Sequence, residues 1–556
     1  MVDVTAIRPA SPRLTFRLRL SSVLVVALSA ILIAPIVAVF AAASGDSEGL
    51  WGHLFETVLA GYVGNTLGLM AGVSVVAVLF GVGAAWIVSR YDFRGRGMLD
   101  WALLLPAAVP AYIVAYTYTD LLEYAGPVQG ALRDLFGWQT SRDYWFPEIR
   151  SMGGAIVVLG GALYPYVYMM TRIAFRMTPS SLFDAARIHR SSAFWNVALP
   201  LARPAIAAGL ALVLMETVSD FGTVEYFALE TLTLGIFNVW LGMNSLPAAA
   251  QIASVATFFV VTLLVIELYA RNKRRFEGGS RHAVGPAPIR LRGAGAIFCL
   301  LLCLIPVSLG FLIPAGVLLT FVLQGLSIGD YGMVLEVTAN SFLVAGGSAA
   351  LILGFSAVIV LSAAFSGSRF LKWVAGAGAI GYAFPGTILA IGVLTFSGAI
   401  DDLLEGLYSA LNIDNGIYLT GSLALVLIAC LVRFQAVGYG AFQTGASRVP
   451  PNLLHAGRLL GRSYAGGLRS IVLPIVRGSA LTGALLAFVD VMKELPMTLL
   501  LRPFNFETLA TLVYQYAKDE LLEQAALPAL VIVLAGIAPV ILMSGMIRRA
   551  STQRSG

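Results

Sequence analysis

The sequence predicts an all-α, polytopic membrane protein with about twelve transmembrane helices arranged in two tandem halves. Three observations support this prediction. The chain of 556 residues is 58% hydrophobic and only 12% charged, which is more apolar surface than a water-soluble domain can bury. Several windows of 18 or more residues have few or no charges, which is the length needed to cross a hydrocarbon core. The same succession of sequence motifs also occurs twice along the chain.

The apolar windows predict six spans in each half. The predicted spans lie at about 22–43, 63–89, 102–122, 153–176, 204–222 and 247–270, and then at about 296–323, 341–366, 371–397, 417–440, 477–500 and 527–547. The first window is longer than the roughly 7–15 residues of a signal-peptide core. We therefore interpret it as a retained span, with a cleaved signal peptide as the alternative.

Charges in the loops predict the topology. Basic residues gather in alternate loops, at 90–96, 172–203, 271–292, 369–372, 448–469 and 548–554, and the loops between them are mostly acidic. Because basic loops stay in the cytoplasm and the number of spans is even, both termini are expected to be cytoplasmic.

Corresponding motifs in the two halves predict a duplicated unit. Stretches beginning at Asn65 and Pro110 are paralleled by stretches beginning at Asn340 and Pro385. We expect a first half at 1–270, a basic cytoplasmic linker at 271–293 and a second half at 294–556. Because six spans per unit is an even number, the two copies are expected to have parallel topology.

Two polar, basic loops stand at equivalent places in the halves, at 184–206 and 455–481. Each contains a Leu-Pro pair followed three residues later by arginine, and apolar residues such as Trp195 recur in them. The pattern predicts a helix–turn–helix that breaks at Pro200. An exposed apolar helix in a cytoplasmic loop indicates a docking surface for a partner outside the membrane.

These loops resemble the EAA loop of binding-protein-dependent ABC importer permeases, in which a short coupling helix fits a groove on the ATPase subunit. The family pattern is Glu-Ala-Ala, then a glycine, then Leu-Pro. The resemblance implies that the ATPase-coupling residues are Asp184, Ala185, Ala186, Arg187, Leu199 and Pro200 in the first loop and His455, Ala456, Gly457, Gly461, Leu473 and Pro474 in the second. The first loop has Arg190 in place of the glycine, and the second has His455 in place of the glutamate. We therefore expect the halves to couple asymmetrically.

The resemblance also implies the partners. They are two copies of an ABC ATPase that uses ATP and Mg²⁺, a periplasmic substrate-binding protein and the lipid bilayer of the bacterial inner membrane, without nucleic acid. The fold implied is that of two six-helix type I permease halves.

Stretches from Met215 and Met492 resemble the fused permeases of bacterial iron(III) importers, which implies ferric iron as the cargo. Related fused permeases for thiamine or phosphonate share this architecture, so another small solute is an alternative. A less favoured alternative is an ion-coupled secondary carrier, which does not require the paired Leu-Pro loops.

Two pairs of carboxylates are candidate residues of the substrate pathway. Glu216 and Asp220 in the first half correspond to Asp490 and Glu494 in the second, and their spacing predicts that each pair shares a helix face. Carboxylates in a span are unfavourable unless they face a polar cavity, and they suit a hard cation. The alternative is a structural role, in which Lys493 neutralises Glu494.

No residue pattern indicates catalysis in this chain. The histidines His53, His189, His282 and His455 do not occur at metal-ligand spacing, and no phosphate-binding glycine-rich loop is present. We therefore expect no enzyme activity, no bound metal and no cofactor, with ATP hydrolysis performed by a separate subunit. The three cysteines lie in apolar runs and are expected to be packing residues.

Overall fold

The computed structural model describes residues 12–277, 287–325, 330–365, 368–413 and 416–552. Within these ranges, eleven helices are long and apolar enough to cross a membrane, and a bent pair of helices makes up a twelfth span. This confirms the prediction of an all-α, polytopic fold with about twelve spans. The middle of the predicted linker, 278–286, lies outside the described residues.

The membrane-spanning helices follow one another in the same order in the two halves, whereas the short elements between them differ. The first half contains α1 (Pro12–Ala43), α2 (Leu50–Thr57), α3 (Leu59–Arg90), β1 (Tyr91–Asp92), α4 (Arg96–Ala102), η1 (Leu105–Ala108), α5 (Ala111–Leu122), α6 (Pro127–Phe136), α7 (Met152–Met177), α8 (Ser180–Ile188), η2 (Ala193–Ala198), α9 (Leu199–Ser219), α10 (Gly222–Tyr226), α11 (Leu232–Phe237), η3 (Asn238–Gly242) and α12 (Leu246–Glu277). The second half contains β2 (Ile289–Arg290), α13 (Ala294–Val307), η4 (Ser308–Leu312), α14 (Ile313–Gly325), α15 (Tyr331–Phe365), α16 (Arg369–Ala377), η5 (Ile380–Ala383), α17 (Gly386–Ala410), α18 (Leu423–Ala446), α19 (Pro451–Leu459), α20 (Tyr464–Gly467), η6 (Leu468–Val472), α21 (Leu473–Met492), α22 (Pro496–Leu501), α23 (Leu509–Lys518) and α24 (Leu522–Thr552). The two strands form a parallel pair that joins the loop after α3 to the chain before α13.

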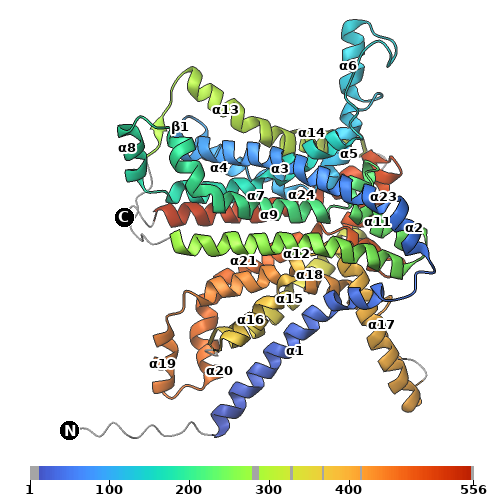
Figure 1. The fold of residues 1–556 in the computed structure, drawn as a ribbon, viewed down its shortest axis with the longest axis vertical. Helices are drawn as coiled ribbons and strands as arrows, with labels where there is room; N and C mark the ends of the chain where they lie inside the picture. The colour runs from blue at the N-terminus through green and yellow to red at the C-terminus, as the bar shows by residue number, and fades with distance from the viewer. Residues whose placement is uncertain (1–11, 278–286, 326–329, 366–367, 414–415, 553–556) are drawn as a thin grey trace.

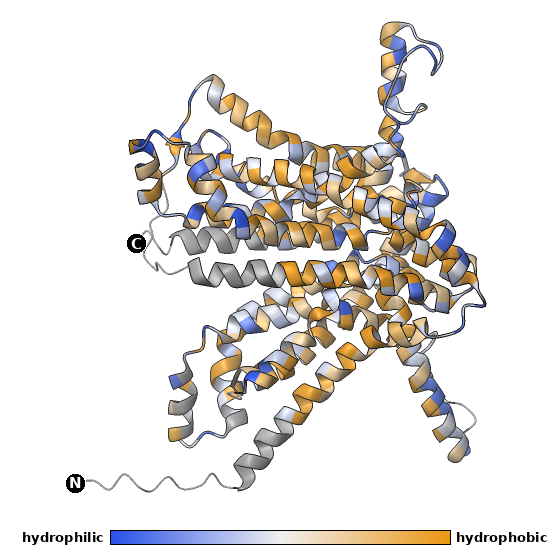
Figure 2. Ribbon diagram, in the orientation of Figure 1, coloured by the Kyte–Doolittle hydropathy of each residue, from blue (hydrophilic) through white to orange (hydrophobic). Residues whose placement is uncertain are grey.

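The long helices give the molecule two distinct ends. The short helices α8 and α19 lie at one end, and α2, α11 and α23 lie at the other (Figure 1). We call these the loop side and the outer side. Apolar residues dominate the helices between the two ends, and polar residues concentrate toward the connecting segments (Figure 2). This distribution is typical of a helical bundle that crosses a bilayer.

The two halves exchange their first spans. Helix α1 packs against α12 of its own half and against α15, α16 and α17 of the other half. In the second half, α14 packs against α24 of its own half and α5 of the first half, and η4 contacts α7. Both crossings are close, since a Cβ atom added at Gly392 would lie 2.0 Å from the Pro35 carbonyl oxygen and one at Gly310 would lie 2.3 Å from the Gly161 carbonyl oxygen.

The third and ninth predicted spans were placed wrongly. Instead of one helix at 102–122, the chain forms α4 and η1 and then turns by 92° into the segment Ala111–Phe136. Instead of a helix at 371–397, it forms α16 and η5, and the long helix α17 begins only at Gly386. Proline explains both breaks, because the residue before it avoids the helical region. Val109 and Phe384 are extended, and Pro110 and Pro385 then precede the next helix.

Small residues allow the fifth span of each half to pack closely on the fourth. A Cβ atom added at Gly209 would lie 2.8 Å from Cα of Val167, and one at Gly483 would lie 2.5 Å from Cβ of Ala441. These two glycines occupy equivalent positions in the repeat. Close backbone approach at small residues is the usual way in which helices associate in lipid.

Candidate functional site

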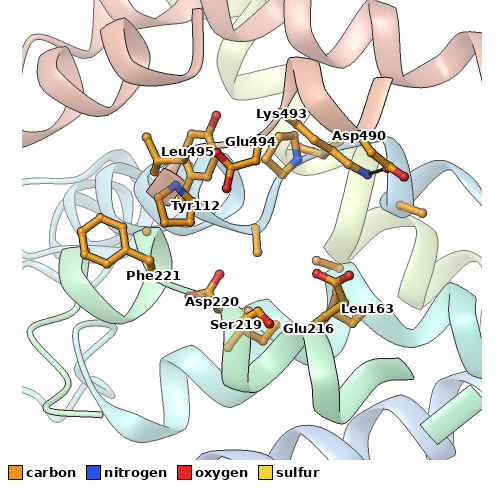
Figure 3. Close-up of a pocket in the computed structure, with 18 of the residues that line it drawn as sticks. Tyr112, Leu163, Glu216, Ser219, Asp220, Phe221, Asp490, Lys493, Glu494 and Leu495 are labelled. Carbon is orange, nitrogen blue, oxygen red and sulfur yellow. Dashed lines mark ion pairs between the residues drawn. The ribbon is translucent and has the colours of Figure 1, made fainter. Parts of the chain in front are cut away.

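A cavity of about 140 Å³ lies between the two halves. Its walls come from α5, α7, α9 and α10 of the first half and from α18, α21 and α22 of the second, with Tyr382 of η5. All four predicted carboxylates line it, and they face one another across the boundary between the halves (Figure 3). The sequence repeat therefore identified residues that the fold brings together.

The first-half carboxylates are held by neutral donors. Glu216 accepts a hydrogen bond of 3.0 Å from the Tyr382 hydroxyl group, which reaches across from the second half. Asp220 accepts hydrogen bonds from the backbone N–H groups of Thr223 (3.0 Å) and Val224 (3.2 Å) and from the Thr223 hydroxyl group (3.1 Å). Asp220 thus satisfies the free N–H groups at the start of α10.

The second-half carboxylates are held by cations. Lys493 pairs with Asp490 at 3.0 Å, and Arg433 of α18 pairs with Glu494 at 3.0 Å. Glu494 is only 5% exposed. It also accepts hydrogen bonds from the backbone N–H groups of Met497 (3.2 Å) and Thr498 (3.0 Å), so it caps the start of α22 as Asp220 caps the start of α10.

This geometry corrects two sequence-based expectations. The members of each pair do not lie on one helix, because α9 ends at Ser219 and α21 ends at Met492. The second carboxylate of each pair instead precedes the next short helix and accepts hydrogen bonds from its first N–H groups. Lys493 neutralises Asp490, whereas the cation that pairs with Glu494 is Arg433.

Arg433 is the functional-site residue that the sequence reasoning missed. It lies 9% exposed in the middle of α18, and its Nη1 atom reaches Glu494. A basic residue inside an otherwise apolar span was the available signal, because such residues are rare unless they have a partner or a role. Its partner could not be inferred, because Glu494 lies 61 residues away in the sequence.

Charge is distributed unequally across the cavity. Among the described residues, the two second-half carboxylates have cationic partners and the two first-half carboxylates have none. Ala162 stands in the first half at the position that corresponds to Arg433 in the repeat. With all six groups ionised, the lining carries a net charge of −2, from four carboxylates and two cations. The cavity is therefore electrostatically suited to a positively charged species.

The two paired loops each form a short helix on the loop side. Helices α8 and α19 contain the predicted coupling residues from Asp184 to Arg187 and from His455 to Gly457. The side chain of His455 lies outside the described residues. The predicted break at Pro200 is wrong, because Pro200 lies in the first turn of α9 and Pro474 lies in the first turn of α21. Each proline lies just after a π-helical turn, η2 or η6, and the helical segment continues through it.

Both short helices end in the same left-handed turn. Ser191 N–H donates to the Ala186 carbonyl at 2.9 Å, and Arg462 N–H donates to the Gly457 carbonyl at 3.0 Å. The turn residue has φ +79° at Gly461 and φ +50° at Arg190. The first loop therefore keeps the turn although it lacks the glycine that favours it.

This difference predicts opposite effects of matched substitutions. Gly461→Val should destabilise its turn by about 1–2 kcal/mol, because a β-branched residue is strained at positive φ. Arg190→Gly should leave its turn unchanged or stabilise it. Open space surrounds the Cβ position at Gly461, so the cost is one of backbone conformation and not of steric contact. Thermal unfolding of the two purified variants measures the difference, and shifts in the same direction would contradict it.

Exposed apolar side chains mark the free surface of these helices. Ile188 is 79% exposed, and Leu459 and Leu460 are 90% and 83% exposed. Asp184, Ala185, Arg187 and Ala456 are also exposed, and Ala186 and Gly457 are buried. Large apolar side chains in this position favour a docking surface.

The first loop is anchored to the bundle by an aromatic cluster. Phe183 of α8 is 2% exposed and lies against Trp86, which also contacts Phe175 and Phe194. The Arg90 guanidinium group lies over the Phe183 ring, 5.0 Å from its centroid. The aromatic cluster fixes the inner face of α8, so the outer face remains available.

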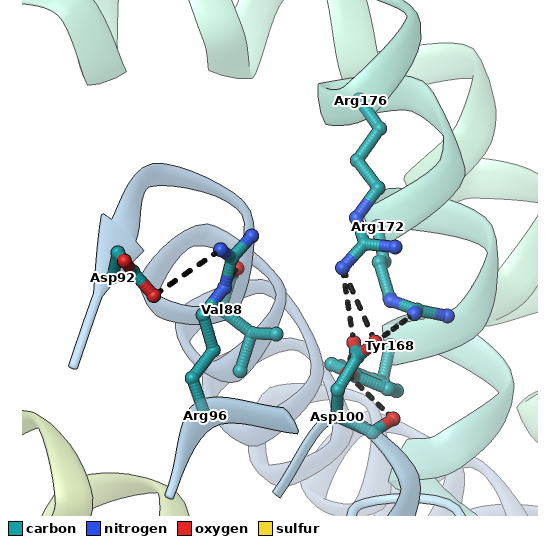
Figure 4. Close-up of polar contacts among 7 residues, drawn as sticks. All are labelled: Val88, Asp92, Arg96, Asp100, Tyr168, Arg172 and Arg176. Atoms are coloured by element: carbon teal, nitrogen blue, oxygen red, sulfur yellow. Dashed lines mark hydrogen bonds and ion pairs between the residues drawn. The ribbon is translucent and has the colours of Figure 1, made fainter. Parts of the chain in front are cut away.

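A buried ionic cluster ties α7 to α4 near this loop (Figure 4). Asp100 pairs with Arg172 and, at 3.2 Å, with Arg176, and it accepts a hydrogen bond of 3.1 Å from the Tyr168 hydroxyl group. Arg172 is only 3% exposed, so it lies inside the bundle. The sequence alone places it in the basic loop at 172–203. Helix α4 continues through η1 to Pro110 at the cavity. The cluster therefore links the root of α8 to the cavity wall.

Comparison with known proteins agrees with this architecture. Residues 77–276 match the family of inner membrane components of binding-protein-dependent transport systems. The chain is 23% identical over 499 residues to the Fe(3+)-transport system permease protein FbpB 2 of Haemophilus influenzae, covering 88% of this chain and 90% of that protein. It is 23% identical to the ferric transport system permease protein FbpB of Actinobacillus pleuropneumoniae, over 82% of this chain and 68% of that protein.

A shorter relative matches only part of the chain. The molybdenum transport system permease protein ModB of Escherichia coli is 29% identical over 221 residues, which cover 93% of that protein and 37% of this chain. A half-length relative is expected where one chain carries two fused copies of a permease unit. Residues 77–276 therefore match the inner membrane component of binding-protein-dependent transport systems, and over most of its length the chain is similar to the iron(III)-transport permeases.

Proposed function

We propose that this chain is the membrane subunit of an ATP-driven importer that moves ferric iron across the bacterial inner membrane. In this proposal a periplasmic binding protein delivers the iron to the outer side. Two copies of an ATPase subunit, which use ATP and Mg²⁺, dock on α8 and α19. Both termini then lie in the cytoplasm, because α1 begins and α24 ends on the loop side (Figure 1).

The observation that carries the proposal is the continuity between the docking surface and the cavity. Chain η2–α9 runs without a break from the first loop at Ala193 to Ser219, where Asp220 follows. The corresponding segment η6–α21 runs from Leu468 to Met492, close to Glu494. Movement at either loop therefore reaches a carboxylate at the cavity through a single helix. ATP binding would draw the two loops together and open the pathway to the outer side, and hydrolysis would restore the inward-open state.

The cavity lining favours a cation over an anion. Oxygen ligands suit hard cations such as Fe³⁺, and a net negative lining repels oxyanions. This distinction matters because relatives named for sulfate and molybdenum transport match 37% of the chain. Lys493 and Arg433 reduce the negative charge, so the lining attracts iron without holding it tightly. A transport site must release its cargo, and weak binding permits release.

Neutralising the first-half carboxylates tests the role of the cavity. The double variant Glu216→Gln, Asp220→Asn should lower uptake of radioactive iron by about tenfold or more, because charge focusing in a cleft raises cation occupancy by this order. The amide side chains have nearly the same size as the carboxylates and keep an oxygen that accepts hydrogen bonds. Folding and assembly with the ATPase should therefore persist. Glu216→Asp, which keeps the charge, is the matched control and should retain most uptake. Full iron uptake by the double variant would overturn the pathway assignment.

The cargo itself is tested by purification from native membranes. The expected result is co-purification of an ABC ATPase and a binding protein whose ligand is iron. A binding protein that carries thiamine, phosphonate or another solute would change the assigned cargo from iron to that solute. It would not contradict the importer mechanism. Uptake that survives ATP depletion and collapses with an uncoupler would instead establish an ion-coupled carrier.

A further inference from the structure

The segment 123–151 extends away from the bundle and is called the outer arm here. It consists of α6 and the chain that returns to α7. In Figure 1 the outer arm projects sideways beyond the neighbouring helices, roughly perpendicular to the long spans, at the outer side of the bundle. The 92° turn between Arg96–Ala108 and Ala111–Phe136 gives it this direction.

Specific contacts give the outer arm a defined structure. The Gln129 side-chain amide donates to the Leu122 carbonyl at 2.8 Å, and the Tyr144 hydroxyl group donates to Gln129 Oε1 at 2.6 Å. Trp138 stacks between Phe136 and Tyr144, with ring centroids 4.7 Å and 4.6 Å apart. The arm is therefore a folded element and not an extended connector.

Acidic and basic side chains complete this folded element. The backbone N–H groups of Thr140 and Gln139 donate to the Asp143 carboxylate and lower its pKa. Arg133 donates to the Tyr124 carbonyl at 2.7 Å and lies over the Tyr124 ring. These contacts hold the returning chain against α6, so the exposed side chains of the arm keep fixed positions.

The outer arm exposes large apolar side chains. Trp145 is 86% exposed, Leu135 is 75% exposed and Phe136 is 59% exposed. In water such a surface would be unfavourable. Tryptophan beside exposed apolar and charged side chains is typical of segments that lie at a membrane–water interface.

The base of the arm is continuous with the lipid-facing surface of the bundle. Helix α5, which leads into the arm, packs against α14, and the Tyr118 hydroxyl group donates to the Leu309 carbonyl at 2.8 Å. On α14, Leu319 and Leu323 are 52% and 64% exposed, and Leu323 lies two residues from the outer end of that helix. A segment that leaves the bundle here, perpendicular to the spans, runs along the outer surface of the bilayer.

We propose that the outer arm is seated in the outer interface of the lipid bilayer, with Trp145, Leu135 and Phe136 immersed among the lipid headgroups and upper acyl chains. The partner is the bilayer itself. Seated in this way, the arm anchors α5, whose residues Ala111 and Tyr112 line the cavity. It holds that wall of the cavity fixed relative to the membrane.

The second half has an apolar projection at the corresponding place. Helix α17, which corresponds to α5 in the repeat, extends outward beyond the bundle (Figure 1). Leu403 and Leu407 lie on it and Leu411 directly follows its last residue; these leucines recur at every fourth position and are 75%, 52% and 59% exposed. Residues four apart share one helix face, so the second half also presents an apolar stripe.

Lipid-based fluorescence quenching tests the proposal. The full-length permease is placed in nanodiscs of phosphatidylethanolamine and phosphatidylglycerol, with a polarity-sensitive fluorophore on Trp145→Cys. Nitroxide groups at the headgroup and upper acyl positions of the lipids should quench most of its emission. The matched control is Arg142→Cys, an exposed polar position of the same arm, which should be quenched less. The unsubstituted chain controls for labelling of the three buried native cysteines.

Two outcomes would overturn the proposal. One is a Trp145 label that is quenched by aqueous iodide and not by nitroxide lipids. The other is a label that becomes protected from iodide only when the co-purified binding protein is added, which would assign the arm to that protein. The intrinsic fluorescence of the unlabelled chain gives a second measurement. Brominated lipids should quench the unsubstituted chain more than Trp145→Phe, and equal quenching would contradict bilayer contact.

Discussion

Replacing Arg433 with leucine is expected to destabilise the protein by about 3–5 kcal/mol, because it leaves the buried Glu494 carboxylate without its cation. Arg433 Nη1 lies 3.0 Å from Glu494 Oε1, and Glu494 is 5% exposed. Hydrogen bonds from the start of α22 remain, so the carboxylate is not left entirely without partners. Thermal unfolding of the detergent-purified variant measures the loss.

A second substitution distinguishes loss of the ion pair from loss of packing. In the double variant Arg433→Leu, Glu494→Gln, the buried charge is gone and the amide oxygen can still accept the N–H groups of α22. We expect this variant to recover most of the lost stability. If Arg433→Leu alone unfolds at the temperature of the unsubstituted protein, the ion pair does not support the fold.

Placing a charge on the coupling surface is expected to abolish binding of the ATPase. Leu459→Asp and Ile188→Asp each introduce a carboxylate at a position that is 90% or 79% exposed in the isolated permease. Burying an unpaired carboxylate at an interface costs several kcal/mol, and about 2 kcal/mol already lowers affinity about thirtyfold. The ATPase recovered with each tagged variant, and the rate of ATP hydrolysis by the recovered complex, provide the measurement.

The same pair of variants tests whether the halves couple unequally. Leu459 is followed by Leu460, which is 83% exposed, whereas Ile188 is followed by His189. We therefore expect Leu459→Asp to have the larger effect. Leu403→Asp places the same charge on an exposed leucine at the outer end of α17 and should leave ATPase binding unchanged. Equal losses at Leu459 and Ile188 would count against asymmetric coupling, and retention of the ATPase by both would count against docking.

Duplication is the reason why so much of this fold could be predicted from the sequence. A motif that occurs twice at equivalent places is unlike a chance pattern. Both paired loops and all four cavity carboxylates were identified in this way. Hydrophobic length alone located most of the spans, because a helix in lipid must satisfy its own backbone hydrogen bonds.

Interactions that occur only once were beyond sequence reasoning. Arg433 has no counterpart in the first half, and Asp100, Arg172 and Arg176 form their cluster only where α4 lies against α7. The packing of the helices that border the cavity determines which cation pairs with which carboxylate. These ion pairs cannot be inferred from spacing along the chain. The 92° turn after η1 was not predicted for a related reason. An apolar window indicates how long a helical segment is, but it does not indicate the direction in which the helix runs.

The exchanged first spans have a consequence for how the two halves stay together. Helix α1 precedes the first half in sequence but packs on α15, α16 and α17, and η4 of the second half contacts α7 of the first. Each half therefore packs its first span against the other half, and these contacts hold the halves together in addition to the peptide chain that joins them. Two separate copies of such a unit would form an obligate pair by the same exchange. Fusion into one chain leaves these contacts intact and frees each half to diverge, as the unequal charges of the cavity show.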